Sequence, residues 1–195
     1  MSRNRMGAHV ELMNNLLCEW HFGERHELRL DGATPAEAYA CIEPGLRAED
    51  PWIQRAIALR EVPGRLLRSV GLSGNALPSS PFGFHSFTPL GKVQNREVAF
   101  GLAGQFWQLD YGLRAIPDAA AFAAMTDQPR LVLNVCVEPI NEQRCRLVTH
   151  TRVHCPTEAQ RRRFAPYWYA IRPVSGLIRQ RLLQRIAHLS QASSP

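Results

Sequence analysis

The stretch that decides the fold is Thr157–Leu189, with the sequence TEAQRRRFAPYWYAIRPVSGLIRQRLLQRIAHL. Its apolar residues recur in steps of three and four, which is the period of an amphipathic helix. This stripe consists of Phe164, Trp168, Ile171, Ser175, Ile178, Leu182, Ile186 and Leu189. The predicted opposite side carries Arg161, Arg162, Arg172, Arg179 and Gln180. A helix with one apolar stripe needs a surface to cover, and the residues before it predict a β-sheet.

The start of this predicted helix has favourable helix signals, whereas its middle contains residues that disfavour a helix. Thr157 is a favourable N-cap, and Glu158 places an acidic residue in the first turn. A continuous helix over this stretch would be about 50 Å long at ~1.5 Å per residue. However, Pro166 and Pro173 lie inside it, and proline lacks the backbone N–H and clashes with the preceding turn. We therefore expect a kink or a break at Pro173.

Alternating apolar and polar residues predict the strands. Glu24–Leu30 and Glu97–Ala103 alternate, and Arg130–Glu138 with Arg144–His154 predict a hairpin. Phe82–Phe87 has a weaker strand pattern. In the last strand, the face predicted to point inward consists of Cys145, Leu147, Thr149, Thr151 and Val153. The other face is predicted to be wetted and consists of Arg144, Arg146, Val148, His150, Arg152 and His154.

Two short helices are predicted after the first strand. Thr34-Pro35-Ala36-Glu37 is a capping pattern with proline in the first turn, and Pro44-Gly45 is predicted to end this helix. Asp50-Pro51 repeats the signal. The predicted class is α+β, a curved antiparallel sheet gripping a long C-terminal helix. We expect residues 1–23 to be an extension with a short helix, 24–189 to be one helix-grip domain, and 190–195 to be a flexible tail.

Composition excludes several classes of protein. Hydrophobic residues make up 45% and charged residues 21% of the chain, which is ordinary for a globular protein. No apolar run reaches the ~20 residues of a membrane span, so we expect a cytoplasmic protein. The net charge is +6, but the arginines are dispersed, so no nucleic-acid partner is expected.

Neither a metal site nor a cofactor is predicted. The five cysteines contain no C-x-x-C pair, and free thiols are expected. His150 and His154 would lie about 13 Å apart on a strand at ~3.3 Å per residue, too far to share one metal ion. The hairpin register also predicts that Cys136 and Cys145 point to opposite faces of the sheet.

Several short motifs occur in the same order as the predicted elements. They are Thr34–Ala38 (TPAEA), Gly101–Trp107 (GLAGQFW), Asn134, Arg161–Phe164 (RRRF), Tyr167-Trp168, Ile171–Pro173 (IRP) and Ser175–Arg179 (SGLIR). With the order of elements, this pattern resembles the START-like helix-grip superfamily (SRPBCC, polyketide cyclase/dehydrase-like), and in particular a bacterial branch of it. The resemblance spans about Glu24 to Leu189. It implies a ligand cavity between the sheet and the final helix, and some members of the superfamily are enzymes.

The candidate ligand-binding residues are aromatic or polar. They are His85, Phe87, Trp107, Asn134, Thr149, Thr151, Tyr167 and Trp168. An aromatic lining with few polar groups suits a pocket for an apolar small molecule, although plain core packing would use the same residues. No catalytic residue is identified. His85 would need a carboxylate partner to act as an acid or base, and Asp110 and Glu138 are the candidates.

Three functions therefore remain open. The first is binding or carriage of an apolar small molecule between the sheet and the C-terminal helix. The second is a cyclase-, dehydratase- or hydrolase-like enzyme that uses the same cavity. The third is an interaction module that contacts a protein or an anionic membrane through Arg161, Arg162, Arg172 and Arg179.

Overall fold

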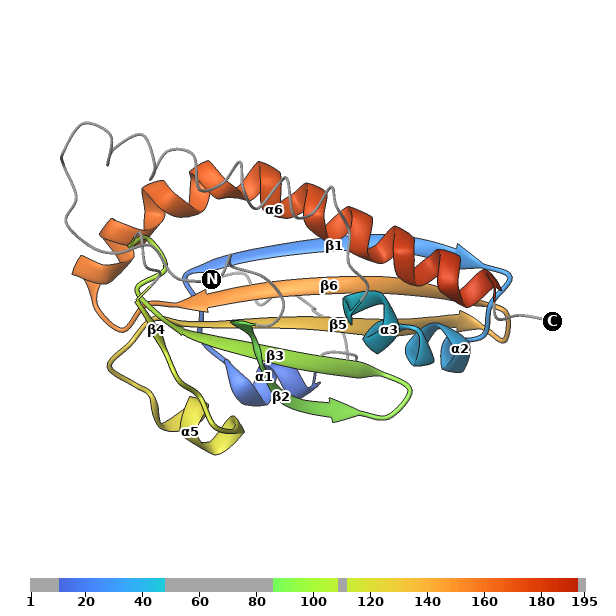
Figure 1. Ribbon diagram of the computed structural model, residues 1–195, viewed down its shortest axis with the longest axis horizontal. Helices are drawn as coiled ribbons and strands as arrows, with labels where there is room; N and C mark the ends of the chain where they lie inside the picture. The colour runs from blue at the N-terminus through green and yellow to red at the C-terminus, as the bar shows by residue number, and fades with distance from the viewer. Residues whose placement is uncertain (1–10, 48–85, 109–111, 193–195) are drawn as a thin grey trace.

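The computed structural model describes residues 11–47, 86–108 and 112–192. A six-stranded antiparallel sheet has the strand order β1-β6-β5-β3-β2, with the short β4 paired to β3. The strands are β1 (Phe22–Asp31), β2 (Thr88–Val93), β3 (Glu97–Gly104), β4 (Leu113–Arg114), β5 (Arg130–Asn141) and β6 (Arg144–His154). The helices are α1 (Glu11–Leu16), α2 (Pro35–Ala40), α3 (Ile42–Arg47), α5 (Ala119–Ala124) and α6 (Glu158–Ala192). Helix α6 lies along one face of the sheet, which confirms the predicted helix-grip class (Figure 1).

Helix α6 is continuous over 35 residues, although Pro166 and Pro173 lie inside it. No break occurs at Pro173, and Figure 1 shows the helix as an arch over the sheet. The predicted N-cap is confirmed, because the Thr157 hydroxyl accepts the backbone N–H of Gln160 at 3.2 Å. The Gln160 side chain in turn accepts the backbone N–H of Thr157 at 3.1 Å. This reciprocal pair satisfies two donors that would otherwise be open at the helix start.

The β5–β6 hairpin is confirmed, but its register differs from the prediction that Cys136 lies opposite Arg146. Cys136 lies opposite Val148, a shift of two residues, and the pairing has an irregularity between Pro139 and Asn141 near the turn. A shift of two preserves the face of every side chain. Cys136 and Cys145 therefore point to opposite faces, as predicted, and all five cysteines are free thiols.

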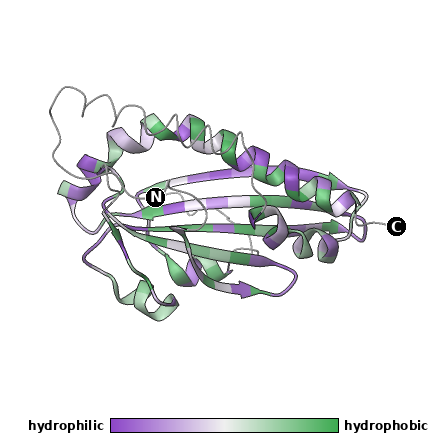
Figure 2. Cartoon of the chain, in the orientation of Figure 1, coloured by the Kyte–Doolittle hydropathy of each residue, from purple (hydrophilic) through white to green (hydrophobic). Residues whose placement is uncertain are grey.

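Two apolar clusters lie between the sheet and α6. The first, near the C-terminal end of α6, is built from Leu30, Val137, Leu147, Leu182, Leu183 and Ile186 together with residues of α2 and α3. The second, near the N-terminal part of α6, is built from Phe22, Leu102, Phe106, Val153, Cys155, Phe164 and Trp168. Figure 2 shows hydrophilic positions along the middle of β6, flanked by hydrophobic ones.

The opposite face of the sheet is covered around Val148, His150 and Arg152, which corrects the prediction that it is wetted there. A third cluster packs there beneath α1 and α5 and consists of Met13, Leu17, Leu90, Ala99, Ala103, Ile116, Phe122, Val132, Cys136 and Val148. His150 and Arg152, which were predicted to face solvent, are buried in this layer. Near the turn, Arg144 is exposed and Arg146 is half-exposed, as predicted. The alternation of β6 was read correctly, but α1 and α5 shield the second face from water around His150 and Arg152.

The helices after β1 differ slightly from the prediction. Thr34 and Glu37 form the expected capping box of α2, but α3 continues through Pro44-Gly45 instead of ending there. Proline is tolerated in a first helical turn because its missing N–H would have no intrahelical partner. Gly45 allows close approach to α6, since a Cβ atom there would lie 2.6 Å from Ile186.

Both ends of the described part of the chain pack into the fold. Helix α6 runs to Ala192, and Ser190 is buried. Helix α1 contributes Met13 to a core cluster, and the division into 1–23, 24–189 and 190–195 stays a prediction. The helix predicted from Asp50 and most of the strand predicted over Phe82–Phe87, including His85, lie outside the described residues.

Candidate functional site

A block of polar side chains interrupts the apolar layer under α6. Glu24 and His26 on β1 lie directly opposite Thr151 and Thr149 on β6. The next pair in one direction is Phe22 with Val153, and the next on that face in the other is Leu28 with Leu147, which belong to the two apolar clusters. We call Glu24, His26, Thr149 and Thr151 the polar band. It lies between the two clusters, where a purely structural core would be apolar.

Helix α6 completes this band from above with Arg172, Gly176 and Arg179, which lie on one helical face. The Arg172 Nε lies 3.5 Å from the Glu24 Oε1, and the Arg179 Nη2 donates to the Thr151 Oγ1 at 3.3 Å. A Cβ atom at Gly176 would lie 3.1 Å from the His26 Cε1. The glycine therefore lets the helix approach the band closely.

These contacts correct the predicted arrangement of arginines on α6. Arg179 was placed on the solvent side, but only 8% of it is exposed and it points toward the sheet. The buried stripe runs through Gly176 and Arg179, whereas Ser175 and Ile178 are only half-buried. Arg172 contacts Glu24, but its side chain is 52% exposed, so among the four arginines predicted to form an outer surface Arg179 alone is removed from it.

The polar band contains a histidine–carboxylate pair. The His26 Nε2 lies 3.1 Å from the Glu24 Oε1, and the two side chains are 18% and 8% exposed. Such a pair is the usual arrangement for a general acid or base. The sequence suggested His85 for this chemistry, with Asp110 or Glu138 as its carboxylate partner. Glu138 instead pairs with Arg25 and Arg146. The alternation of β1 already placed His26 on the inner face, and this signal could have identified it.

Thr149 is the most informative residue of the band. It is 1% exposed, and among the described residues its Oγ1 has no hydrogen-bond partner. A buried polar atom without a partner costs about 1–3 kcal/mol, so such atoms are rare in native proteins. A water molecule or a ligand atom would satisfy this hydroxyl.

The aromatic candidate residues lie beside the polar band and surround Phe164. The sequence predicted Phe164 only as part of the apolar stripe of the helix. Phe164 contacts Phe22, Phe106, Trp107, Tyr167 and Trp168, with ring centroids 4.9 to 6.3 Å apart. Phe87 packs against the same cluster. We call this group the aromatic cluster. Four of the predicted site residues, Phe87, Trp107, Tyr167 and Trp168, therefore lie together, and Thr149 and Thr151 lie in the adjoining band.

Asn134 does not belong to this site, which is a second correction. It lies on the opposite face of the sheet, where its Nδ2 donates to the Glu97 Oε2 at 3.0 Å. Its Oδ1 accepts the backbone N–H of His150 at 3.1 Å and lies 3.1 Å from the His150 Nδ1. The other oxygen of Glu97 accepts the backbone N–H of Leu12 at 2.7 Å. We call Glu97, Asn134 and His150 the outer network; it fastens α1 to the sheet.

The outer network is not arranged for nucleophilic catalysis, although Cys136 lies next to it. The Cys136 Sγ is 3.9 Å from the His150 Nδ1, the same nitrogen that faces Asn134. Burial raises the pKa of the Cys136 thiol far above its usual range, and burial lowers the pKa of His150 to about 4, with Arg25 and Arg152 adding to the effect. A neutral thiol beside a neutral imidazole is a poor nucleophile.

Within residues 11–47, 86–108 and 112–192, no group of three or more histidine, cysteine or acidic side chains is placed to hold a metal ion. Among the helices in those same ranges, none has the length and apolarity needed to cross a bilayer.

Comparison with known proteins adds little to this geometry. No family model matches the chain, and no curated protein matches it. Among solved structures, norcoclaurine synthase from Thalictrum flavum, in complex with dopamine and hydroxybenzaldehyde, is 10% identical with a TM-score of 0.34. That match covers 100% of this chain and 99% of the synthase chain. At this TM-score the similarity carries no conclusion about the site.

Proposed function

We propose that this protein binds a small, mainly apolar molecule between the sheet and α6. The apolar part of the ligand lies against the aromatic cluster, and a hydroxyl or carbonyl group of the ligand meets the polar band. The observation that carries this proposal is the buried Thr149 hydroxyl, which is partnerless among the described residues and lies directly between two apolar clusters.

The energetics of the band support a ligand more than a structural role. Replacing both members of a buried polar contact with apolar groups of the same shape can be neutral or stabilising. Valine or leucine at the positions of the polar band would therefore stabilise the fold about as well as the polar residues do. A ligand that carries a hydrogen-bonding group makes use of such polar atoms, because it pairs with them in a layer from which water is largely excluded.

The test uses a neutral, environment-sensitive fluorophore, N-phenyl-1-naphthylamine, displaced by pairs of competitors that differ only in one hydroxyl. We expect saturable probe binding by the wild-type protein and a preference for the hydroxylated member of each pair. Thr149→Val should keep probe binding but reduce this preference about 2- to 10-fold, the worth of one hydrogen bond of ~0.5–1.5 kcal/mol. Thr149→Ser, which keeps the hydroxyl, is the matched control.

Two results would contradict the proposal. One is the absence of saturable probe binding by the wild-type protein. The other is an equal loss of preference in Thr149→Ser and Thr149→Val, which would show that packing rather than the hydroxyl is responsible.

A second candidate function is acid–base catalysis on the bound molecule, and the His26–Glu24 pair favours it. The Glu24 carboxylate lies 3.1 Å from the His26 Nε2 as a charge partner, although the geometry is not that of a hydrogen bond. A ligand group near Thr149 would lie beside His26, since these two residues are cross-strand neighbours. His26→Gln should then abolish turnover while leaving probe affinity within about twofold. Retained turnover of a substrate in His26→Gln would exclude this role for His26.

A further inference from the structure

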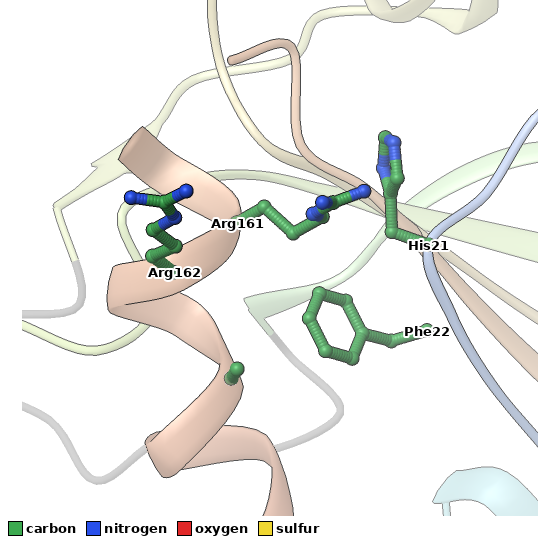
Figure 3. A pocket seen from close by; sticks show the side chains of 5 residues that line it. His21, Phe22, Arg161 and Arg162 are labelled. Atoms are coloured by element: carbon green, nitrogen blue, oxygen red, sulfur yellow. The ribbon is translucent and has the colours of Figure 1, made fainter. Parts of the chain in front are cut away.

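A separate cleft of about 300 Å³ lies where the N-terminal part of α6 faces the start of β1. It is lined by His21, Phe22, Arg161, Arg162 and Ala165. Figure 3 shows Arg161 reaching from the helix toward His21, with the ring of Phe22 below it. The volume is at the lower end of the range of ligand-binding pockets.

Every polar side chain that lines this cleft is a hydrogen-bond donor. The His21 Nδ1 accepts the backbone N–H of Cys155 at 3.2 Å, so the neutral ring carries its proton on Nε2 and donates there. Arg161 and Arg162 offer only N–H groups and remain cationic at any physiological pH. The remaining lining, Phe22 and Ala165, is apolar. Such a lining matches a molecule that combines an anionic group with a small apolar part.

Among the described residues, the ion pairs of the two cleft arginines are both with Glu158, so these three side chains together carry a net positive charge. Glu158 contacts both arginines, with its Oε2 2.5 Å from the Arg161 Nη2 and its Oε1 3.0 Å from the Arg162 Nε. A single carboxylate thus serves two guanidinium groups. The His154 ring lies 5.0 Å from the His21 ring, and burial followed by the charges of His21 and Arg130 lowers the His154 pKa. Glu19 is the acidic residue that opposes this effect.

We propose that this cleft binds a small organic anion, a carboxylate or a phosphate monoester, whose apolar part lies over Phe22 and Ala165. The Arg161 guanidinium, which points toward His21, binds the anionic group together with the His21 Nε2–H, and Arg162 adds positive charge at the rim of the cleft. Binding occurs in competition with Glu158, which already occupies one side of each arginine. The cleft shares Phe22 with the aromatic cluster, but it recognises charge through His21 and the two arginines rather than through the polar band.

The test is calorimetric titration of the full chain with benzoate and with phenyl phosphate, using benzyl alcohol as the uncharged comparison. We expect saturable binding of at least one anion, and we expect exchange of the two arginines to weaken binding of the anion but not of the alcohol, which lacks the charge that the cleft recognises. Whichever anion binds more tightly, benzoate or phenyl phosphate, shows whether the cleft prefers a carboxylate or a phosphate group. Arg161→Gln with Arg162→Gln should weaken binding at least tenfold, and Glu158→Gln should strengthen it several-fold, because it removes the competing carboxylate.

Arg163 provides the matched control, because it is the next arginine on the same helix, is exposed, and does not line the cleft. Arg163→Gln should leave anion affinity within about twofold of the wild type. The proposal is wrong if neither anion saturates, if the double variant weakens benzyl alcohol as much as the anions, or if Arg163→Gln loses as much affinity as the double variant. A second measurement uses vesicles that contain phosphatidylserine. If the protein binds these vesicles, and Arg163→Gln weakens this binding as much as the double arginine variant does, the basic surface is diffuse and the proposal of a specific cleft is wrong. Because the exchanged arginines are exposed, unchanged denaturation midpoints are expected and confirm that every variant folds.

Discussion

Beneath α6 the sheet buries Thr149 without a partner among the described residues, and on the opposite face beneath α1 it buries Asn134 with both ends of its amide bonded. The two residues lie on neighbouring strands only one register step apart, since Thr149 pairs with Val135 and Asn134 with His150. In the outer network, the amide of Asn134 and the carboxylate of Glu97 have hydrogen-bond partners within the fold, so the network has a structural role. The polar band has the features of a binding surface, because it leaves hydrogen-bonding capacity unused inside the protein.

The aromatic cluster beside the polar band should contribute the largest single effect. Trp168 is 5% exposed and packs against Phe22 and Phe164, so Trp168→Ala should lower the free energy of unfolding by about 3–5 kcal/mol. Urea denaturation followed by circular dichroism measures this loss. The neighbouring Tyr169 is 64% exposed, and Tyr169→Ala should change stability by less than about 0.5 kcal/mol. Similar midpoints for the two variants would show that the ring of Trp168 does not support the inner layer.

Breaking the outer network should have the next largest effect. Asn134→Leu keeps the approximate volume but removes the donor to Glu97 and the acceptor for the backbone of His150. Each buried group left without a partner costs about 1–3 kcal/mol, so a loss of roughly 3 kcal/mol is expected in the same denaturation experiment. Ligand-probe affinity should remain unchanged, because Asn134 faces α1. A loss of probe binding at full stability would instead return Asn134 to the ligand site.

The outer network should also make stability depend on pH. The pKa of His150 is lowered to about 4 in the folded protein, against 6.5 as its ordinary value. The folded state thus favours the neutral ring, so this contribution is complete above about pH 6.5 and is lost as the pH falls toward 4. Between pH 7.5 and 5 the loss is about 2 kcal/mol at ~1.4 kcal/mol per pKa unit.

The control for this pH effect is His150→Gln, which has no group that titrates at this position. The difference in unfolding free energy between the wild type and His150→Gln should shrink by that amount over the same interval. Parallel curves for the two proteins would show that His150 titrates normally and is not buried in the folded state.

The comparison of the two faces also explains what the sequence could predict. Alternation in β6 correctly separated Thr149 and Thr151 from His150 and Arg152, because side chains alternate across a strand. It could not show that both faces are covered, since that depends on α1 packing from more than a hundred residues away: Asn14 and Leu17 accept hydrogen bonds from Arg152 at 2.8 and 3.2 Å. A charged residue on a strand therefore looked wetted, although its partners lie in α1 and just after it.

The candidate site was predictable to a similar degree. The aromatic residues of α6 and the threonines of β6 were identified from their types and spacing. Asn134 was grouped with these residues because of the motif resemblance. The alternation of side chains along β5 instead places it on the other face of the sheet. Arg179 was misplaced because the stripe of α6 includes Gly176, whose missing side chain lets the helix lie close to His26 and turns Arg179 toward Thr151.

The smallest expected effect is the one that sharpens the comparison most. Thr149→Val exchanges a buried hydroxyl that has no partner among the described residues for a methyl group of similar size. No bond is lost, and the desolvation cost of the hydroxyl is removed, so the unfolding free energy should stay within about 1 kcal/mol of the wild type or rise. Asn134→Leu, a similar polar-to-apolar exchange one register step away, should cost roughly 3 kcal/mol. Chemical denaturation of both variants in the same buffer measures the difference. A Thr149→Val protein as unstable as Asn134→Leu would mean that the Thr149 hydroxyl is bonded within the fold, and the inner face would then be as structural as the outer one.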